Sequence, residues 1–435
     1  MNPKIKKVLL LSIPAILAEV SSIAMQYIDA SMVGFLGAKA SASIGLVAST
    51  TWLVMGCMMA FATGFSVQVA QYIGAKEREE ACNVLKLSMM VAVIFGSLLS
   101  IICFSIAPVL PHWLHGSDEI IQDATMYFKV YGLSLLFVQF RILCGSMLQC
   151  SGDMKTPSVL TVCMCLLDVI FNYIFIYLCH LGVMGAAMGT ALSESIVSLA
   201  MAWKVYFHSD ISWHNGGSWN WNSFTLVRAN SIGLPIALEH AVLNIAQILI
   251  VRIVAPLGTV AVAANSLAVT AESLCYMPGY GIAAAATTLV GQSAGARNRQ
   301  AVRSYARIST GLGILIMTCS SVAMFILAPY IFAMLTSSAQ VQELGVKVLR
   351  MECLVEPFFA TSIVVAGALR GMGDTLIPSL LNLLSMWGIR VPLSYFLAMP
   401  YGLMGVWFAM ASELVIRGAL FGVRLLREKW IPASL

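Results

Sequence analysis

The sequence predicts an all-α integral membrane protein, with twelve transmembrane helices in two pseudo-twofold-related six-helix lobes. Three observations predict this fold class: the composition, the number of long apolar stretches and an internal repeat. Of the 435 residues, 59% are hydrophobic and only 10% are charged, whereas soluble proteins carry roughly 25% charged residues. With a mean hydropathy of +0.87, the chain has too few polar side chains to cover a water-soluble surface, so lipid must be its solvent.

The repeat has a constant offset of 221 residues, which is the separation between Pro14 and Pro235. The same offset relates seven further pairs of identical residues: Gly37 and Gly258, Gln71 and Gln292, Gly74 and Gly295, Leu148 and Leu369, Gly152 and Gly373, Asp153 and Asp374, and Pro157 and Pro378. Two like-oriented halves of an apolar chain indicate a duplicated helical bundle. Many secondary transporters bind their substrate between such halves.

Apolar stretches long enough to cross a bilayer, which takes about 20 residues, occur twelve times. Their approximate limits are 8–33, 44–72, 86–110, 125–149, 158–179, 183–207, 226–255, 262–292, 304–333, 347–370, 378–400 and 403–425. The first stretch is too long for a signal peptide and is not followed by a small-residue cleavage site. We therefore interpret it as the first span.

The connecting segments define the lobes and their orientation. The longest polar stretch lies near the middle, so we expect an N-lobe at 1–207, a cytoplasmic linker at 208–225 and a C-lobe at 226–435. Lys and Arg concentrate in the loops on one side of the predicted membrane. The positive-inside rule then places both termini in the cytoplasm, as expected for a multi-pass protein of the cytoplasmic (inner) membrane.

Several function classes lack the motifs they require. The chain has no phosphate-binding loop of the ATPase type and no His-Glu-x-x-His sequence, so we expect no enzyme and no organic cofactor. No Lys/Arg run is long enough for nucleic acid, and the eleven Cys sit mostly in apolar runs as small buried side chains. The expected partners are small organic substrates and the lipid bilayer, with the monomer as the functional form.

Proline occurs at matched positions in the first span of each half, at Pro14 and Pro235. Each proline removes a backbone hydrogen bond and bends its helix. The matched kinks are either a packing feature or a pair of hinges used during transport.

Four polar residues are expected together in the outer half of the N-lobe: Asp29, Asp168, Asn172 and Thr190. Charged groups at the bilayer centre cost about 2.5–3.5 kcal/mol each on insertion scales, so those that persist face a lumen or a partner. Asp168 and Asn172 are four residues apart and share a helix face. Two carboxylates, an amide and a hydroxyl suit Na⁺ or a titrating proton; the alternative is a structural hydrogen-bond network. No other metal site is predicted.

A second group is expected near the midplane of the C-lobe: Glu239, Glu272, Glu356 and Arg390. Arg390 with one of these glutamates would form a buried ion pair that locks helices together. An acid left without such a partner would then handle substrate or protons.

Two further acids follow serine at matched places in the last span of each half, Glu194 and Glu413. Their symmetry favours a structural task, such as pairing with a nearby arginine. Asp153 and Asp374 lie before matched prolines, where turn formation and helix capping explain them.

These pieces together resemble the multidrug and toxic compound extrusion (MATE) family of the multidrug/oligosaccharidyl-lipid/polysaccharide exporter superfamily. The resemblance covers essentially the whole chain and rests on the order and repetition of these motifs: Pro14, Tyr27-Ile-Asp29-Ala-Ser-Met-Val-Gly34, Gln71-Tyr-Ile-Gly74-Ala, Gln149-Cys-Ser-Gly152-Asp153, Gly185-Ala-Ala-Met-Gly-Thr190 and Leu369-Arg370-Gly-Met-Gly373-Asp374.

The resemblance implies an antiporter that exports organic, often cationic and amphipathic, compounds in exchange for H⁺ or Na⁺ by alternating access. Asp29 matches the family's N-lobe cation residue, with Asp168, Asn172 and Thr190 as its partners. The chain departs from one common pattern, in which Asn precedes Asp by four residues, because here Asp168 comes first. In the C-lobe, Glu356 fits the span 10 position, whereas Glu239 lies about one turn early in span 7.

Two other functions stay open from the sequence. A flippase for a lipid-linked or other amphipathic substrate, from the same superfamily, would favour a cavity rich in arginine, since such substrates carry phosphates. Arg141, Arg252 and Arg390 are compatible with that. A channel or structural membrane component is the third possibility. The sequence identifies neither the substrate nor the coupling ion, which is H⁺ or Na⁺.

Overall fold

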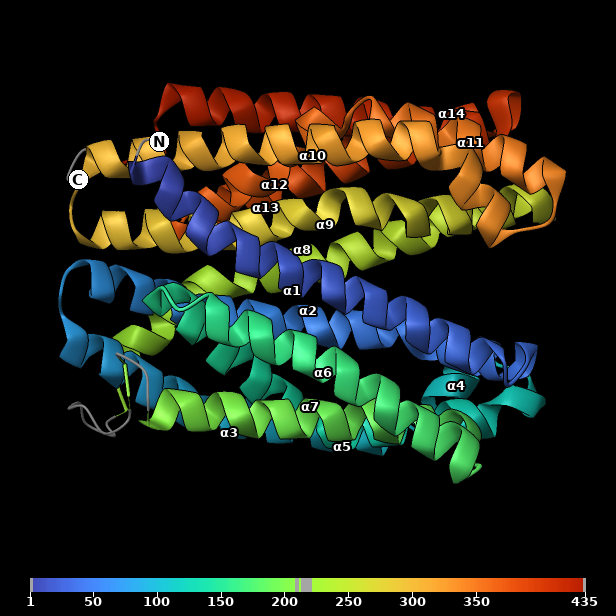
Figure 1. Cartoon of the computed structure of the whole chain (residues 1–435), viewed down its shortest axis with the longest axis horizontal. Helices are drawn as coiled ribbons and strands as arrows, with labels where there is room; N and C mark the ends of the chain where they lie inside the picture. The colour runs from blue at the N-terminus through green and yellow to red at the C-terminus, as the bar shows by residue number, and fades with distance from the viewer. Residues whose placement is uncertain (1–2, 208–210, 213–220, 433–435) are drawn as a thin grey trace. The chain divides into compact units, whose positions relative to one another are not determined.

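The computed structural model describes residues 3–207, 211–212 and 221–432, and these residues form helices and their connections without a strand (Figure 1). The first half contains α1 (Pro3–Gly34), α2 (Ala38–Gly74), α3 (Arg78–Ile106), α4 (Leu110–Trp113), α5 (Asp118–Ser151), α6 (Lys155–Tyr173), the π-helix η1 (Ile174–Leu178) and α7 (Gly182–Phe207). The second half contains α8 (Ser223–Val254), the 3₁₀-helix η2 (Ala255–Leu257), α9 (Thr259–Gly295), α10 (Arg299–Leu335), α11 (Ala339–Cys353), α12 (Glu356–Gly371), α13 (Leu376–Ser385), the π-helix η3 (Met386–Arg390) and α14 (Val391–Arg427). Most of the predicted linker 208–225 lies outside the described residues.

The predicted twelve spans are all present as helical segments. Within the described residues, ten helical segments are long and apolar enough to cross a membrane, and α11 and α12 form a further span bent by 55°. One of the ten runs from Leu376 to Arg427, which is 52 residues. A helix of that length would measure about 78 Å, far more than the hydrocarbon core. The backbone leaves helical geometry at Gly402 (φ 60, ψ −144), which divides the segment into the predicted spans 11 and 12.

Contacts divide the chain into two compact units, but not at the middle of the sequence. The C-terminal unit consists of Met1–Glu19 and Leu238–Leu435, and the N-terminal unit is Val20–Ala237. The predicted lobes 1–207 and 226–435 follow the chain, whereas the contact units exchange the first part of α1 for the first part of α8. The exchanged segments carry Pro14 and Pro235, so each proline-containing half-helix packs with the other half of the sequence.

Small residues make this exchange possible, because they allow helix backbones to approach closely. In the N-terminal unit, a Cβ on Gly64 of α2 would lie 2.4 Å from the carbonyl oxygen of Ala229 in α8. The Nε2 group of Gln68 also donates to the carbonyl of Thr225 at 3.2 Å. In the C-terminal unit, a Cβ on Gly281 of α9 would lie 2.6 Å from the backbone nitrogen of Ile16 in α1. The two contacts join equivalent helices of the repeat.

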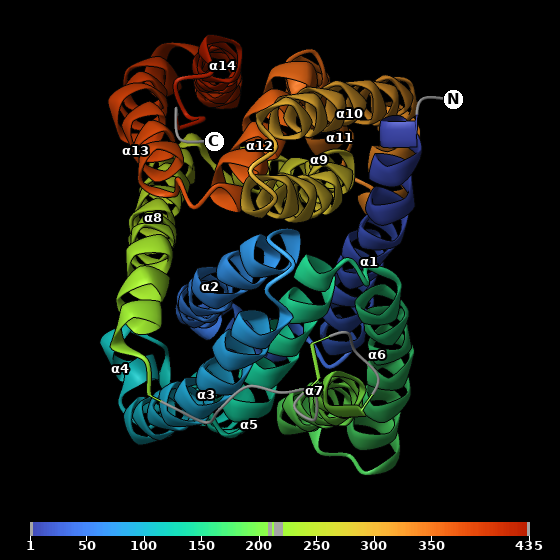
Figure 2. The same ribbon diagram turned by 90° about the vertical axis from the view of Figure 1, so that its left-hand side faces the viewer.

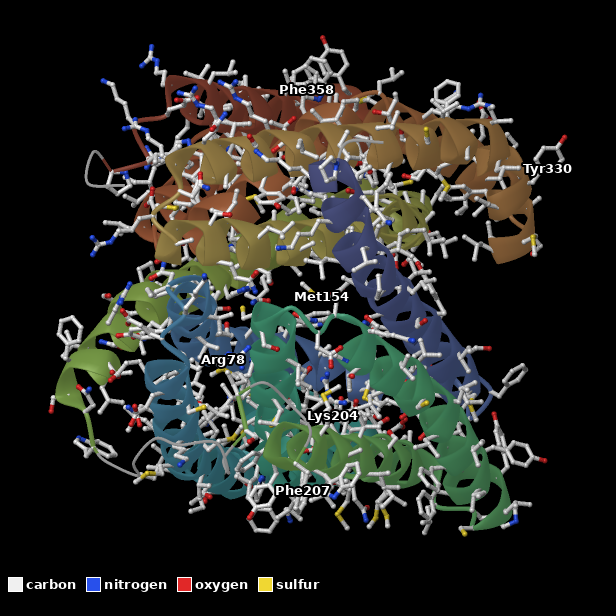
Figure 3. All side chains as sticks on the ribbon, turned by 60° about the vertical axis from the view of Figure 1, so that its left-hand side comes forward. Arg78, Met154, Lys204, Phe207, Tyr330 and Phe358 are labelled. Carbon is white, nitrogen blue, oxygen red and sulfur yellow. The ribbon has the colours of Figure 1, made fainter. Side chains whose placement is uncertain are left out.

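Apolar side chains line both the interior and the exterior of the units. In the C-terminal unit, α9, α10 and α12 pack side by side, as Figure 2 shows end-on. Phe207, Tyr330 and Phe358 project outward (Figure 3) and are 53%, 70% and 41% exposed. Large apolar groups on the outside are stable in lipid, which agrees with the composition.

We predict that Gly64→Ala lowers the stability of the protein by about 1–3 kcal/mol, because the new methyl group meets the α8 backbone and not a movable side chain. The measurement is the melting temperature in detergent. Gly45→Ala is the matched control, since Gly45 lies on the same helix and a Cβ there would meet nothing within 4 Å. Equal melting of the two variants would contradict the assigned α2–α8 contact.

Candidate functional site

The four residues predicted for the N-lobe meet at one place, contributed by α1, α6 and α7. The Nδ2 group of Asn172 donates to Oδ1 of Asp29 at 2.9 Å and to Oδ2 of Asp168 at 3.0 Å. Asp168 and Asn172 are almost completely buried, and the two carboxyl groups also interact with each other. One amide therefore bridges two acids that the chain separates by 139 residues.

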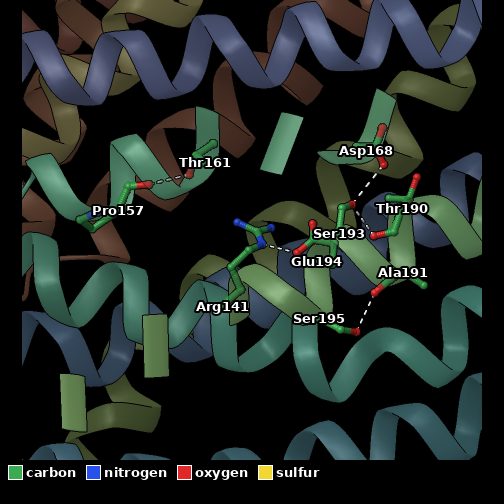
Figure 4. A network of polar contacts seen from close by, with 9 residues as sticks. All are labelled: Arg141, Pro157, Thr161, Asp168, Thr190, Ala191, Ser193, Glu194 and Ser195. Carbon is green, nitrogen blue, oxygen red and sulfur yellow. Dashed lines mark hydrogen bonds and ion pairs between the residues drawn. The ribbon is translucent and has the colours of Figure 1, made fainter. Parts of the chain in front are cut away.

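Ser193 belongs to this site although sequence reasoning did not select it. Its single hydroxyl hydrogen has two acceptors within reach, Oδ1 of Asp168 at 3.3 Å and the carbonyl oxygen of Thr190 at 2.9 Å (Figure 4). Ser193 lies three residues after Thr190 on α7, hence on the same helix face. That spacing is the signal that could have identified it.

An ion pair lies beside the acid site, between Arg141 of α5 and Glu194 of α7 (Figure 4). Both side chains are largely buried, at 18% and 9% exposure. Removing one partner of a buried pair leaves an uncompensated charge, so this pair fixes α5 against α7. The pairing agrees with the structural task expected for Glu194.

Two glycines allow α7 to approach α6 and the following π-helix η1 closely enough to form the site. A Cβ on Gly189 would lie 2.0 Å from Oδ1 and 2.8 Å from the backbone nitrogen of Asn172. A Cβ on Gly185 would lie 2.8 Å from the carbonyl carbon and oxygen of Phe175. The Gly-Ala-Ala-Met-Gly sequence thus presents a flat strip against which the Asn172 amide packs.

A cavity of about 480 Å³ opens onto this network. Asp29, Asn172 and Thr190 line it together with the aromatic side chains of Trp52 and Tyr127, whereas Asp168 lies behind them. The Oδ1 atom of Asn172 is buried and has no hydrogen-bond partner among the described residues. Carboxylate, amide and hydroxyl oxygens around a cavity form a donor set for a hard cation, and the aromatic rings suit an organic one.

Glu239 of the C-terminal unit is held in a satisfied network of its own. Its carboxylate accepts hydrogen bonds from the Ser379 hydroxyl and from Nδ2 of Asn382, both at 2.6 Å. The guanidinium of Arg370 lies 3.6 Å away. All these partners come from α12 and α13, so Glu239 ties α8 to them.

Other acids of the C-lobe lack the hydrogen-bond partners that Glu239 has among the described residues. Glu352 and Glu356 flank the break between α11 and α12; both are 1% exposed, and all four of their carboxyl oxygens lack a hydrogen-bond partner among the described residues. Glu272 of α9 is buried and interacts electrostatically with both. Glu352 was absent from the predicted site, although it precedes Glu356 by four residues.

The expected pairing of Arg390 with a glutamate is not seen among the described ion pairs. Arg390 ends the π-helix η3, and its Nη2 group points at the sulfur of Met410, 2.6 Å away. Arg417 instead pairs with Glu413 at 3.2 Å, which agrees with the structural task expected for Glu413. The π-turn explains the difference, because it changes the direction of the Arg390 side chain relative to a regular helix.

A family model described as MatE matches the chain twice, at residues 14–174 and 235–396. The chain belongs to the MatE family. The two matches begin at Pro14 and Pro235, so the family unit and the internal repeat coincide. Members of this family are transporters, and this MatE protein is a multi-pass membrane transporter and not an enzyme.

Curated relatives resemble this MatE protein over nearly its whole length. The probable multidrug resistance protein NorM of Thermotoga maritima is 26% identical over 438 residues, covering 98% of this chain and 94% of the relative. The uncharacterized transporter YisQ of Bacillus subtilis is 25% identical over 401 residues, covering 91% and 88%.

Solved structures share the fold. A multidrug resistance MATE family transporter in an outward-facing conformation superposes with a TM-score of 0.92 at 21% identity, covering 98% of this chain and 97% of the other. A transporter of the multidrug/oligosaccharidyl-lipid/polysaccharide exporter superfamily from Pyrococcus furiosus, described as having a binding pocket of reversed polarity, gives 0.91 at 20% identity, covering 98% and 96%. These likenesses confirm the predicted fold class.

We predict that Gly189→Ala reduces transport of a fluorescent organic cation at least about tenfold, since its methyl group would displace the Asn172 amide from both carboxylates. Gly145→Ala is the control, because its Cβ would meet only the sulfur of Met201 at 3.6 Å. Both variants are first compared by their melting temperatures. Full transport by Gly189→Ala would show that the amide bridge is dispensable.

Proposed function

We propose that this MatE protein is a secondary antiporter that exports organic, cationic and amphipathic compounds from the cytoplasm in exchange for H⁺ or Na⁺. The observation that carries the proposal is the 480 Å³ cavity in which Asp29 faces Trp52 and Tyr127. Its volume lies in the range of small-molecule sites, about 300–1,000 Å³. The multidrug resistance names of several relatives point the same way.

The cavity can take an organic cation by two interactions. Aromatic faces attract cations, worth about 0.5–2 kcal/mol depending on desolvation, and the carboxyl group of Asp29 supplies the counter-charge. Apolar residues such as Val33 and Ile44 complete the lining. A site with few fixed polar groups tolerates many amphipathic molecules, which is the basis of broad specificity.

Exchange follows from competition for the same carboxyl group. Asp29 and Asp168 share one amide, and two carboxylates this close do not both ionise easily. A proton or Na⁺ at the pair lowers their combined negative charge and so weakens the attraction for an organic cation. The inorganic ion and the organic compound therefore exclude each other, which is the requirement for antiport.

Ion binding at Asp29 can act on both units through helix α1, because Asp29 belongs to the N-terminal unit and the first 19 residues belong to the C-terminal unit. Pro14 weakens the helix in the segment that leads to this boundary. We propose Pro14, and Pro235 in the equivalent part of α8, as hinges whose bending accompanies alternating access.

The C-terminal unit divides its acids between structure and proton handling in this proposal. Glu239 is fixed by Arg370 and its hydrogen bonds, so it takes the structural task. Among the described residues, Glu352 and Glu356 are buried without hydrogen-bond partners, and a carboxyl group in that environment is most stable when it carries a proton. Glu272 is buried and interacts electrostatically with both. They form a proton-handling cluster separate from Asp29.

The flippase alternative receives less support. It needs arginines around the substrate, but Arg141 pairs with Glu194 and Arg390 contacts Met410. Neither of these arginines lines the 480 Å³ cavity, and Arg252, the third candidate, lines a different cavity. For the antiporter we propose the cytoplasmic membrane as its location, cytoplasmic termini and a functional monomer, with no cofactor beyond the coupling ion.

We predict that Asp29→Asn abolishes exchange, because the variant can neither bind a proton nor offer a charge to Na⁺. The measurement is uptake of a fluorescent organic cation into everted vesicles under an imposed gradient, with Na⁺ present and absent at fixed pH. Na⁺ dependence at constant pH identifies Na⁺ as the coupling ion, and its absence identifies H⁺. Asp123→Asn is the control, since Asp123 is an exposed acid of α5. Wild-type exchange by Asp29→Asn would refute the site.

We predict opposite outcomes for two kinds of C-lobe variant. Glu239→Ala should be destabilised by about 3–5 kcal/mol, because it leaves the Arg370 charge unpaired. The double variant Glu352→Gln/Glu356→Gln should fold normally but change the pH dependence of exchange, since glutamine resembles a permanently protonated acid. Melting temperatures and pH profiles distinguish them. A normal melting temperature for Glu239→Ala would contradict its structural task, and an unchanged pH profile for the double variant would contradict proton handling.

A further inference from the structure

A cavity of about 570 Å³ lies in the C-terminal unit, between the end of α8 and the start of α14. It shares no lining residue with the cavity that Asp29 lines. Its lining is apolar and partly aromatic, including Ile253, Pro392, Tyr395 and Phe396. Arg252 is the one charged residue in the lining. A long apolar groove with a single cation has the chemistry to hold an amphiphile with an anionic head.

Arg252 differs from four arginines of the spans that pair with acids, and from Arg390, which contacts Met410. Arg141, Arg370, Arg417 and Arg424 each face a carboxylate within 4.0 Å. Arg252 is exposed and makes no ion pair or hydrogen bond to the part of the chain that the structure describes. An unpaired guanidinium beside lipid is costly unless it reaches the interface or meets an anion.

Arg252 lies near the end of a candidate membrane span, Ser223–Leu257. Arg252 lies two residues before Val254, where α8 ends, and residues 391–399 approach the break at Gly402. Both segments therefore lie near the same surface, opposite the side on which α8 and α13 begin. With Ser223–Leu257 as a membrane span, a residue this close to its end is expected at headgroup level, with the rest of the groove along the hydrocarbon layer.

We propose that this groove binds one anionic phospholipid of the surrounding leaflet, with its phosphate on Arg252 and an acyl chain along Tyr395 and Phe396. Guanidinium groups bind phosphate through paired, charge-assisted hydrogen bonds. The two aromatic side chains are 66% and 70% exposed, so an acyl chain has open apolar surface to cover. The organic compounds of the proposed function are cationic, and Arg252 repels them from this groove. The lipid would join α8 to α14 without touching the Asp29 cavity.

The test is native mass spectrometry of the purified full-length protein, with phosphatidylglycerol or phosphatidylcholine of equal chain length added. We expect phosphatidylglycerol to bind more tightly, because the choline group offsets the phosphate charge. Arg252→Gln should weaken phosphatidylglycerol binding about tenfold and leave phosphatidylcholine binding nearly unchanged. Arg252→Lys should retain part of the preference.

Lys129→Gln is the matched control, since it removes one positive charge from the N-terminal unit, outside the groove. It should bind phosphatidylglycerol as the wild type does. Phe396→Ala provides a second variant, and it should weaken both lipids because it shortens the apolar contact. Unchanged phosphatidylglycerol binding by Arg252→Gln, or an equal loss in Lys129→Gln, would overturn the proposal. Either result leaves the exchange activity at Asp29 a separate question, because exchange is measured independently.

Discussion

The constraint on which this structure depends is that hydrocarbon satisfies no polar group. Backbone groups must therefore be paired within helices, and every charge inside the membrane must find a protein partner, a lumen or a proton. The described residues obey the first requirement by being helical nearly throughout. The second requirement sorts the ionisable side chains into those that fasten helices together and those that are left for function.

The fastening pairs and the remaining acids are distributed differently. Glu194 and Glu413 occupy related places in the two halves, but Glu194 pairs with Arg141 across α5 and α7, whereas Glu413 pairs with Arg417 within α14. By contrast, the repeat offset carries Asp29 onto Ile250, so the acid site occurs once. The repeat thus describes a shared helical scaffold, whereas the Asp29 site belongs to the first half alone.

Each of the helices α1 and α8 is divided between the two units. Each unit contains the first part of the other half's leading helix, and those parts contain Pro14 and Pro235. Close glycine contacts, such as Gly64 with α8, hold the exchanged parts firmly. Helix α1 therefore has residues in both units, and Pro14, the proposed hinge, precedes Asp29 on the same helix.

The sequence by itself determined the helices, the twelve spans, the repeat and the grouping of Asp29 with Asp168 and Asn172. The spans follow from apolar length and the Asp168–Asn172 pair from spacing along one helix, which are local properties of the chain. Asp29 was grouped with that pair by its predicted depth in the membrane. Only the tertiary structure decided that Glu239 pairs with Arg370 and that Ser193 supports Asp168. The physical reason is that a side chain's partner depends on the rotation, tilt and breaks of neighbouring helices, which no local pattern encodes.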